Sequence, residues 1–282
     1  RAIAIEIFEG RGDGDSIWLD LRDVPDELWE SDLPGRYDLR CLLRGFDWKN
    51  RTLRISPGAI THLGGIGIKP WCETNLPGLY AAGESAAPVH GARRRGGNAF
   101  SDCLVFGARA GRAAAERARD NPLLVSDADW DREAVKERLA DIRAWDRPPS
   151  EEGDPAAIRS ELQRTMWENA GPLRSGERLE TSLEDLQAIK RDRLPNLHAR
   201  TPFEVKAALE AETLVKVGEM VVRSACFRTE SRGCHFRTDY PNTDQENWIC
   251  HDVILRGQEP FKREVDVIRV SLPVPVRSAH AD

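Results

Sequence analysis

The chain has 282 residues, enough for about two domains and for a hydrophobic core that needs neither disulfides nor a metal. Hydrophobic residues make up 40% and charged residues 31%, which excludes collagen-like and wholly disordered proteins. The net charge of -6 argues against nucleic acid as a partner, because nucleic-acid binders are usually basic. No stretch approaches the roughly 20 apolar residues that span a bilayer, so we expect a soluble, cytoplasmic chain without direct membrane insertion. Any membrane association would come through a partner subunit.

The cysteines are scattered, with no Cys-x-x-Cys pair and no histidines at metal-ligand spacing. This pattern predicts reduced, mostly packed thiols and no metal site. The six residues are Cys41, Cys72, Cys103, Cys226, Cys234 and Cys250.

Residues 1–56 are predicted to form strands and loops. Within them, residues 16–21 alternate apolar and polar side chains, as a half-buried strand does. Two further strands are predicted around residues 66–68 and 78–83. The sequence Asn-Leu-Pro-Gly at residues 75–78 predicts a tight turn between them.

The second half of the chain is predicted to be mainly helical. Apolar residues three and four apart predict a helix over residues 101–119, and Asn121-Pro122 would end it. Residues 127–230 are predicted to form a run of helices, whose short connections favour an antiparallel bundle. After Gly233 we expect loops and short strands, notably at residues 265–270. The predicted N-caps are Asp127 and Asp154, the predicted breaks are Gly171-Pro172 and Leu194-Pro195, and the last helix covers residues 201–230.

A glycine-rich loop is the most unusual segment. Residues 90–98 carry three arginines and the pair Gly96-Gly97, between a predicted strand that ends at Gly83-Glu84 and a predicted helix. Glycines let a flat ligand approach the backbone, and a helix N-terminus stabilises negative charge. The arrangement therefore predicts an anion or cofactor site, and the alternative is an ordinary turn with a solvated arginine run. Residues 64–67 lack the third glycine of the dinucleotide fingerprint.

Several ordered motifs resemble the flavoprotein subunits of succinate dehydrogenases and fumarate reductases. Residues 64–111 read GGIGIKPWCETNLPGLYAAGESAAPVHGARRRGGNAFSDCLVFGARAG, where the family shows a Gly-Gly-Ile strand, a Gly-Leu-Tyr/Phe-Ala-x-Gly-Glu strand, a His-Gly-Ala-Asn-Arg-Leu-Gly-Gly-Asn loop and a Val-Phe-Gly-x-x-Ala-Gly helix. The resemblance continues with Glu161-Leu162-Gln163, with ESRGCHFRTDYP at residues 230–241, and with Glu246-Asn247-Trp248. It covers nearly the whole chain but only the C-terminal half of the family's length. Arg1 in place of a starting Met also indicates a piece of a longer protein.

This resemblance implies FAD as the cofactor, and hydride transfer between flavin N5 and a dicarboxylate or related small acid such as succinate or fumarate. It implies that Arg94 clamps a substrate carboxylate through its fork of donors, and that His90 lies beside flavin and substrate. The implied partner is an iron-sulfur electron-transfer subunit. The implied FAD-binding residues are Gly83, Glu84 (on the ribityl chain), Gly97, Asn98, Ala99 and Phe100, and the helix that follows would face the flavin pyrimidine carbonyl. For Arg93 and Arg95 we expect solvent exposure, and for His235 and His251 structural roles.

Three departures from the family pattern bear on these roles. The Asn and Leu of the family's loop are replaced by Arg93 and Arg95. The family's substrate histidine falls at Ile60, and His62 takes that catalytic role only if a bulge shifts the strand. The family's dinucleotide-binding start, its covalent-flavin histidine and its proton-donating arginine all precede Arg1. We therefore expect this chain alone to be inactive and not to hold FAD tightly.

These features predict an α/β remnant of an FAD-binding, Rossmann-like domain and of a capping domain, followed by an antiparallel helix bundle and a small β/loop C-terminal region. The predicted boundaries are 1–55 for the end of the capping domain, 56–125 for the C-terminal part of the FAD-binding domain, 126–232 for the bundle and 233–282 for the C-terminal extension. Two alternatives stay open: an L-aspartate oxidase or other FAD-dependent acid dehydrogenase, and a non-catalytic helical interaction module.

Overall fold

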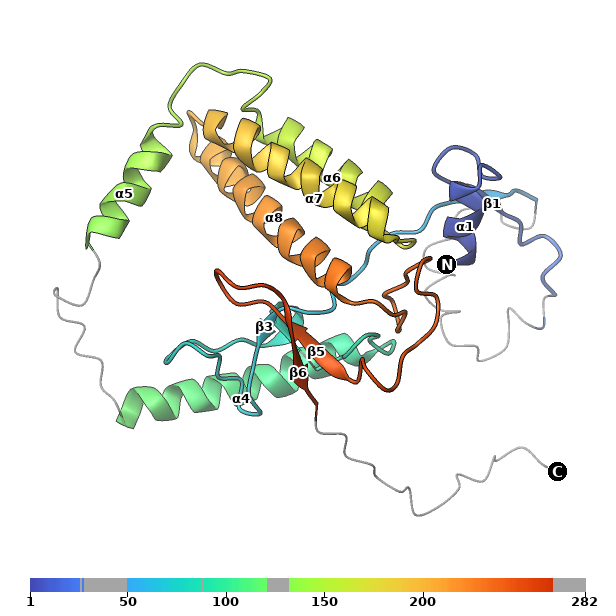
Figure 1. Cartoon of the computed structure of the whole chain (residues 1–282), viewed down its shortest axis with the longest axis horizontal. Coiled ribbons are helices and arrows are strands. Elements are labelled where there is room, and N and C mark those ends of the chain that lie inside the picture. The colour runs from blue at the N-terminus through green and yellow to red at the C-terminus, as the bar shows by residue number, and fades with distance from the viewer. Residues whose placement is uncertain (26, 28–49, 88, 121–131, 266–282) are drawn as a thin grey trace, which may run out of the picture.

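The computed structural model describes residues 1–25, 27, 50–87, 89–120 and 132–265 (Figure 1). Helices dominate it, and each of its sheets pairs two short strands. In the part that is described, no helix is long and apolar enough to cross a membrane.

The chain begins with a helix, α1 (Ala2–Phe8), so the prediction of only strands and loops for residues 1–56 is wrong there. An isolated helix of this length would be unstable, and tertiary contacts stabilise it. Ala4 is buried, and the Phe8 ring stacks on Trp167 with 6.5 Å between the ring centroids. The predicted strand at residues 16–21 is confirmed as β1 (Ile17–Leu19), which pairs antiparallel with β2 (Leu53–Ile55).

A second small sheet pairs β3 (Ile66–Gly67) in parallel with β4 (Ala86–Ala87), and β3 agrees with the strand predicted there. The strand predicted at residues 78–83 is wrong. Tyr80 makes a single isolated bridge to Glu73, and the chain then enters the 3-10 turn η1 (Gly83–Ser85). Gly83 has φ of +71°, which an extended strand does not tolerate. The turn predicted at residues 75–78 is present, closed by the Leu79 amide donating to the Leu76 carbonyl at 3.1 Å.

The next helix, α4 (Asn98–Asp120), begins three residues before the predicted start at Ser101. Most of the helix is exposed in the described structure. Leu104 is 74% exposed, and Asp102 is the one buried residue of α4. Gly107 and Gly111 lie about one turn apart on this helix, a spacing that would permit close packing against a sheet. No atom of the described chain outside the helix lies within 4 Å of a Cβ built on either glycine.

Three helices pack on one another after the described part resumes at residue 132: α6 (Pro155–Ala170), α7 (Gly176–Ala188) and α8 (Pro202–Phe227). Their ends follow the predicted signals. The predicted N-cap Asp154 accepts a hydrogen bond from the Ala156 amide at 3.0 Å, and Thr201 forms a capping box with Glu204. Gly171 ends α6, as predicted, and a π-turn, η2 (Ile189–Arg193), followed by a 3-10 turn, η3 (Leu194–Asn196), marks the predicted break at Leu194-Pro195. The other predicted N-cap, Asp127, lies outside the described residues.

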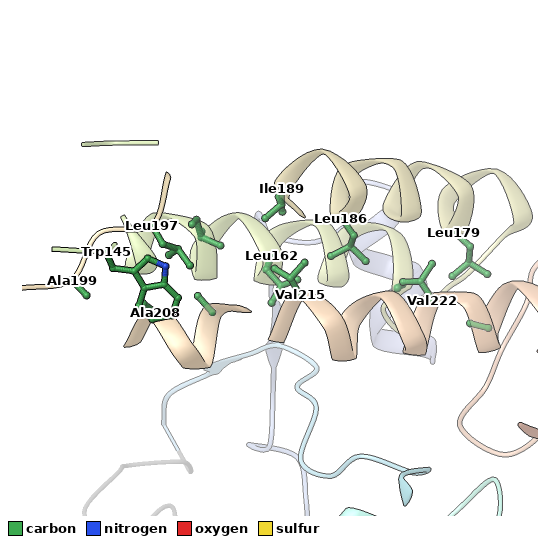
Figure 2. Close-up of a cluster of buried hydrophobic side chains, with 14 residues drawn as sticks. Trp145, Leu162, Leu179, Leu186, Ile189, Leu197, Ala199, Ala208, Val215 and Val222 are labelled. Atoms are coloured by element: carbon green, nitrogen blue, oxygen red, sulfur yellow. The ribbon is translucent and has the colours of Figure 1, made fainter. Parts of the chain in front are cut away.

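The hydrophobic core lies between these three helices. Leu162 of α6, Leu186 of α7 and Val215 of α8 face one another there (Figure 2). Gly218 allows this close approach, because a Cβ at this position would lie 3.3 Å from Leu162 Cδ1 and 3.4 Å from Leu186 Cδ2. The remaining helix, α5 (Arg132–Arg143), has no fully buried residue; it contacts the core only near its C-terminal end, where Ile142 packs against it, and the ion pair of Arg138 with Glu212 links it to α8 (Figure 1).

Short strands follow the bundle, as predicted: β5 (Cys250–Val253) pairs antiparallel with β6 (Phe261–Glu264). All but the first residue of the strand predicted at 265–270 lies outside the described residues. Among the five described cysteines, Cys72 is buried, whereas Cys103 and Cys234 are exposed. The prediction of packed thiols is therefore wrong for Cys103 and Cys234. Cys41 lies outside the described residues.

His235 packs between cations near the end of α8. Its Nδ1 lies 2.8 Å from Arg174 Nη1, and its Nε2 lies 3.3 Å from the Arg228 carbonyl oxygen. Burial first, and then the positive charge of Arg174, lower the pKa of His235 from 6.5 to about 4. This position agrees with the structural role expected for His235.

We predict that this histidine makes the fold less stable as the pH is lowered. The unfolded chain binds a proton near pH 6.5 and the folded chain only near pH 4, so the folded state loses stability as the pH falls through that window. His235→Gln keeps a donor and an acceptor but does not titrate, and its melting temperature should fall less between pH 7 and 4 than that of the wild type. Equal slopes of melting temperature against pH in the two proteins would contradict the prediction.

Candidate functional site

A pocket opens where residues 61–64, the segment around η1 and β4, and the first turn of α4 meet. Its walls are partly apolar, with Leu63, Ala86 and Val89 among them. The polar and titratable side chains that line it are Thr61, His62, Glu84, His90, Arg94, Asp102 and Cys103. Both signs of charge therefore meet in one hollow beside a helix N-terminus.

Glu84 joins two walls of the pocket. Its Oε1 accepts a hydrogen bond from the His62 backbone amide at 2.8 Å. This bond is the main reason that the pKa of Glu84 is lowered. It also places His62 at the pocket without any strand, since residues 56–65 form neither helix nor strand. Ile60, where the family's substrate histidine falls, is 88% exposed and does not line the pocket.

His90 reaches an acidic partner that the sequence did not single out. Its Nε2 lies 3.2 Å from Oδ2 of Asp102, whose side chain is 4% exposed. Asp102 sits one turn inside α4, where it is the one carboxylate in a helical stretch that also holds Phe100, Leu104 and Val105. That break in the apolar pattern is the signal that could have identified Asp102.

Two polar atoms in this pocket are buried without a hydrogen-bond partner in the described part of the chain: Nε of Arg94 and Oδ1 of Asp102. Buried polar atoms are rarely left unpaired, because each costs about 1–3 kcal/mol. One is a cationic donor and the other an anionic acceptor, so together they suit a ligand that offers both kinds of partner.

The three consecutive arginines differ in their exposure, as expected. Arg93 and Arg95 are exposed, whereas Arg94 is partly buried and lines the pocket. The sequence predicted this difference from the resemblance alone, because an arginine run by itself is usually solvated.

The residues expected to bind the cofactor divide into two groups. Glu84 and Ala99 line the pocket. Gly83 lies directly beside it, since a Cβ there would approach Cys103 Sγ to 3.2 Å. The second group lies on an exposed rim at the start of α4, outside the pocket lining: Gly97 with φ of +81°, Asn98, and Phe100, which is 83% exposed.

Comparison with known proteins shows which protein family the sequence of this chain matches. Residues 1–100 match the model described as FAD binding domain, and residues 159–278 match the model described as Fumarate reductase flavoprotein C-term. The chain is 34% identical over 259 residues to the fumarate reductase flavoprotein subunit of Mycobacterium tuberculosis, covering 87% of this chain and 43% of that protein. It is 30% identical over 261 residues to the L-aspartate oxidase of Nostoc, covering 86% of this chain and 43% of that protein.

The fold agrees with these sequence matches. The structure of Mycobacterium smegmatis Sdh1 in complex with UQ1 superposes with a TM-score of 0.78 at 31% identity, covering 95% of this chain and 47% of that one. The fold is thus that of an FAD-binding domain joined to a flavoprotein C-terminal helical domain. The chain belongs to the family of succinate dehydrogenase and fumarate reductase flavoprotein subunits, to which the L-aspartate oxidases are related. It spans about half the length of the curated relatives it matches.

The residues present fit FAD, the cofactor that the family match indicates. A Cβ built on Gly91 or Gly97 meets no atom within 4 Å, so the described backbone there is open to a flat ligand. The carboxylate of Glu84 is an acceptor suited to hydroxyl groups, as a ribityl chain offers. The first turn of α4 borders the pocket through Ala99, and the amides of a helix N-terminus favour negative charge.

Proposed function

We propose that this chain is the C-terminal part of an FAD-dependent oxidoreductase that transfers a hydride between flavin N5 and a dicarboxylate such as succinate or fumarate. The observation that carries the proposal is the pocket in which Arg94, whose buried Nε has no partner among the described residues, meets His90, His62 and Glu84 at the N-terminus of α4. The relatives named as fumarate reductases support it.

The chain's own side chains divide the work between binding and positioning. Arg94 binds one substrate carboxylate, because a guanidinium stays charged and can donate two parallel hydrogen bonds to it. Asp102 holds the His90 ring against the pocket wall at 3.2 Å, so His90 is a fixed rather than a freely rotating neighbour of the substrate. His62, whose backbone amide donates to Glu84, lines the same pocket.

The residues that would hold FAD are Gly83, Glu84, Gly97, Asn98, Ala99 and Phe100. When bound, FAD would supply the flavin ring that exchanges electrons with the substrate. The amides at the start of α4 would stabilise negative charge on it. Residues 1–55 would complete a capping domain, 56–125 an FAD-binding, Rossmann-like domain, and 126–232 an antiparallel helix bundle, with residues 233–282 as an extension. An iron-sulfur subunit is the proposed electron partner, and membrane association would come through such partner subunits.

The test uses the full-length flavoprotein that contains this chain. Flavin content is measured by absorbance. The rates of succinate oxidation, fumarate reduction and L-aspartate oxidation are then compared, with artificial dyes as the electron acceptor or donor. We expect one FAD per chain and turnover with succinate or fumarate. Turnover with L-aspartate alone would replace the dicarboxylate assignment by an L-aspartate oxidase, and a protein without flavin would contradict the whole proposal.

A further inference from the structure

A tight turn from the C-terminal part of the chain touches the loop that carries Arg94. The Cys234 amide donates a hydrogen bond to the Ala92 carbonyl oxygen at 2.9 Å. A Cβ at Gly233 would lie 2.2 Å from the same oxygen and 3.0 Å from the Ala92 Cβ, far inside any real contact distance. Gly233 also has φ of +59°, so only glycine fits both the backbone conformation and the space.

The turn itself is closed and cannot easily move. The Arg232 and His235 backbones exchange hydrogen bonds of 2.9 and 3.0 Å, which make a narrow bridge around Gly233. Arg232 donates from Nε and Nη2 to the buried carboxylate of Glu230 at 2.7 and 2.9 Å. Glu230 in turn pairs with Arg228 at 2.6 Å, directly after the end of α8.

The far side of the turn is tied to the C-terminal end of α6. His235 Nδ1 lies 2.8 Å from Arg174 Nη1, and the Arg174 Nε donates to the carbonyl oxygens of Ala170, the last residue of α6, and of Gly171, its C-cap, at 2.9 and 3.0 Å. A chain of hydrogen bonds therefore runs from the helix bundle through residues 230–235 to Ala92.

Ala92 stands midway between His90 and Arg94, two residues from each. Apart from the contact of His90 with Asp102, the loop around it has few supports in the described chain. Arg93 and Arg95 are exposed, and within the described chain a Cβ on Gly91, Gly96 or Gly97 meets no atom within 4 Å. A glycine-rich loop with little packing has many conformations, so one firm contact at its centre has a large effect on where Arg94 lies.

We propose that Gly233 and the turn of residues 230–235 are a positioning element that fixes the Arg94 loop against the helix bundle, and so sets the affinity for the substrate carboxylate. This inference rests on the proposed function of Arg94 as the carboxylate clamp. Neither Gly233 nor Cys234 lines the pocket, so the role is positioning rather than contact with substrate.

The test compares Gly233→Ala with Gly257→Ala in the full-length flavoprotein with its FAD. Gly257 has φ of +76° and a Cβ there meets no atom of the described chain, so it matches the backbone strain of Gly233 without touching the loop. We expect KM for succinate to rise at least tenfold in Gly233→Ala, with kcat changed less than about threefold, and both constants to stay near wild type in Gly257→Ala. Loss of uniform binding without loss of turnover is the signature of a displaced clamp.

Hydrogen exchange gives a readout that does not depend on the substrate. Amides of residues 89–97 should exchange at least tenfold faster in Gly233→Ala than in Gly257→Ala. If the wild type turns over no dicarboxylate, the proposed function fails, and this exchange experiment still decides whether the turn holds the loop.

Arg232→Lys serves as a milder variant in case Gly233→Ala does not fold. It keeps the charge but loses the bidentate hydrogen bonding to Glu230. The KM for succinate should therefore also rise, but by a smaller factor than in Gly233→Ala. Unchanged KM together with unchanged exchange of residues 89–97 in a folded, flavin-loaded variant would overturn the proposal.

Discussion

Arg94→Ala in the complete flavoprotein should lower kcat/KM for the dicarboxylate by two orders of magnitude or more, on the order of 3 kcal/mol. The Arg94 Nε is buried and unpaired within the described chain, so the pocket already bears the cost of one charged donor without a partner. A substrate carboxylate would supply the missing partner. Removing one member of such a pair leaves the other buried and uncompensated, which typically costs about 3–5 kcal/mol.

The neighbouring arginines provide the controls. Arg93→Ala and Arg95→Ala remove the same charge from the same loop, but both side chains are exposed, so their kcat/KM should stay within a few-fold of the wild type. Arg94→Lys keeps the charge and loses the fork of donors, so it should recover only part of the activity. Steady-state kinetics with succinate and fumarate, corrected for flavin content, measure all four variants. If Arg95→Ala is the inactive variant instead, the loop has been aligned wrongly.

The sequence predicted the helices well where a local capping residue or a glycine marks the end of the helix. Asp154 and Thr201 cap α6 and α8, and Gly171 ends α6, because these signals act within one turn of the chain. The misses have a different origin. Helix α1 is too short to be stable alone and depends on Trp167 of α6, a partner more than 150 residues away.

The site shows the same division. The resemblance pointed to Arg94, His90 and Glu84, and to His62 only if a bulge shifted the chain from Ile60; the structure brings all four of these side chains to one pocket. The partnership of His90 with Asp102 was missed, since a carboxylate inside a predicted helix gives no sign of which loop folds back onto it. The contact of Gly233 with Ala92 spans 141 residues of sequence, and no local pattern predicts a contact of that kind.

The second large effect is expected at Glu230. Its side chain is fully buried, and it accepts hydrogen bonds from Arg228 at 2.6 Å, from Arg232 at 2.7 and 2.9 Å, and from the Asp244 amide at 2.9 Å. Burial alone would raise the pKa of Glu230, but the hydrogen bonds from Arg232, the Asp244 backbone and Arg228 outweigh it, so the pKa is lowered. The carboxylate therefore stays charged, and the stability it contributes is lost only as the pH falls below about 4.5 and through its lowered pKa.

Glu230→Gln keeps the shape of the side chain and removes its charge, which leaves Arg228 and Arg232 facing each other without a shared counter-ion. We expect the free energy of unfolding to fall by about 3–5 kcal/mol, the usual cost of breaking a buried ion pair from one side. Glu259→Gln is the matched control: Glu259 also pairs with an arginine, Arg223 at 3.1 Å, but its side chain is 89% exposed, so the same change should cost less than about 1 kcal/mol. Urea unfolding at pH 7, followed by circular dichroism, measures both variants. Equal losses in the two would mean that the Glu230 cluster, despite its burial, is no stronger than a surface ion pair, and that the turn at Gly233 is held by its backbone bonds alone.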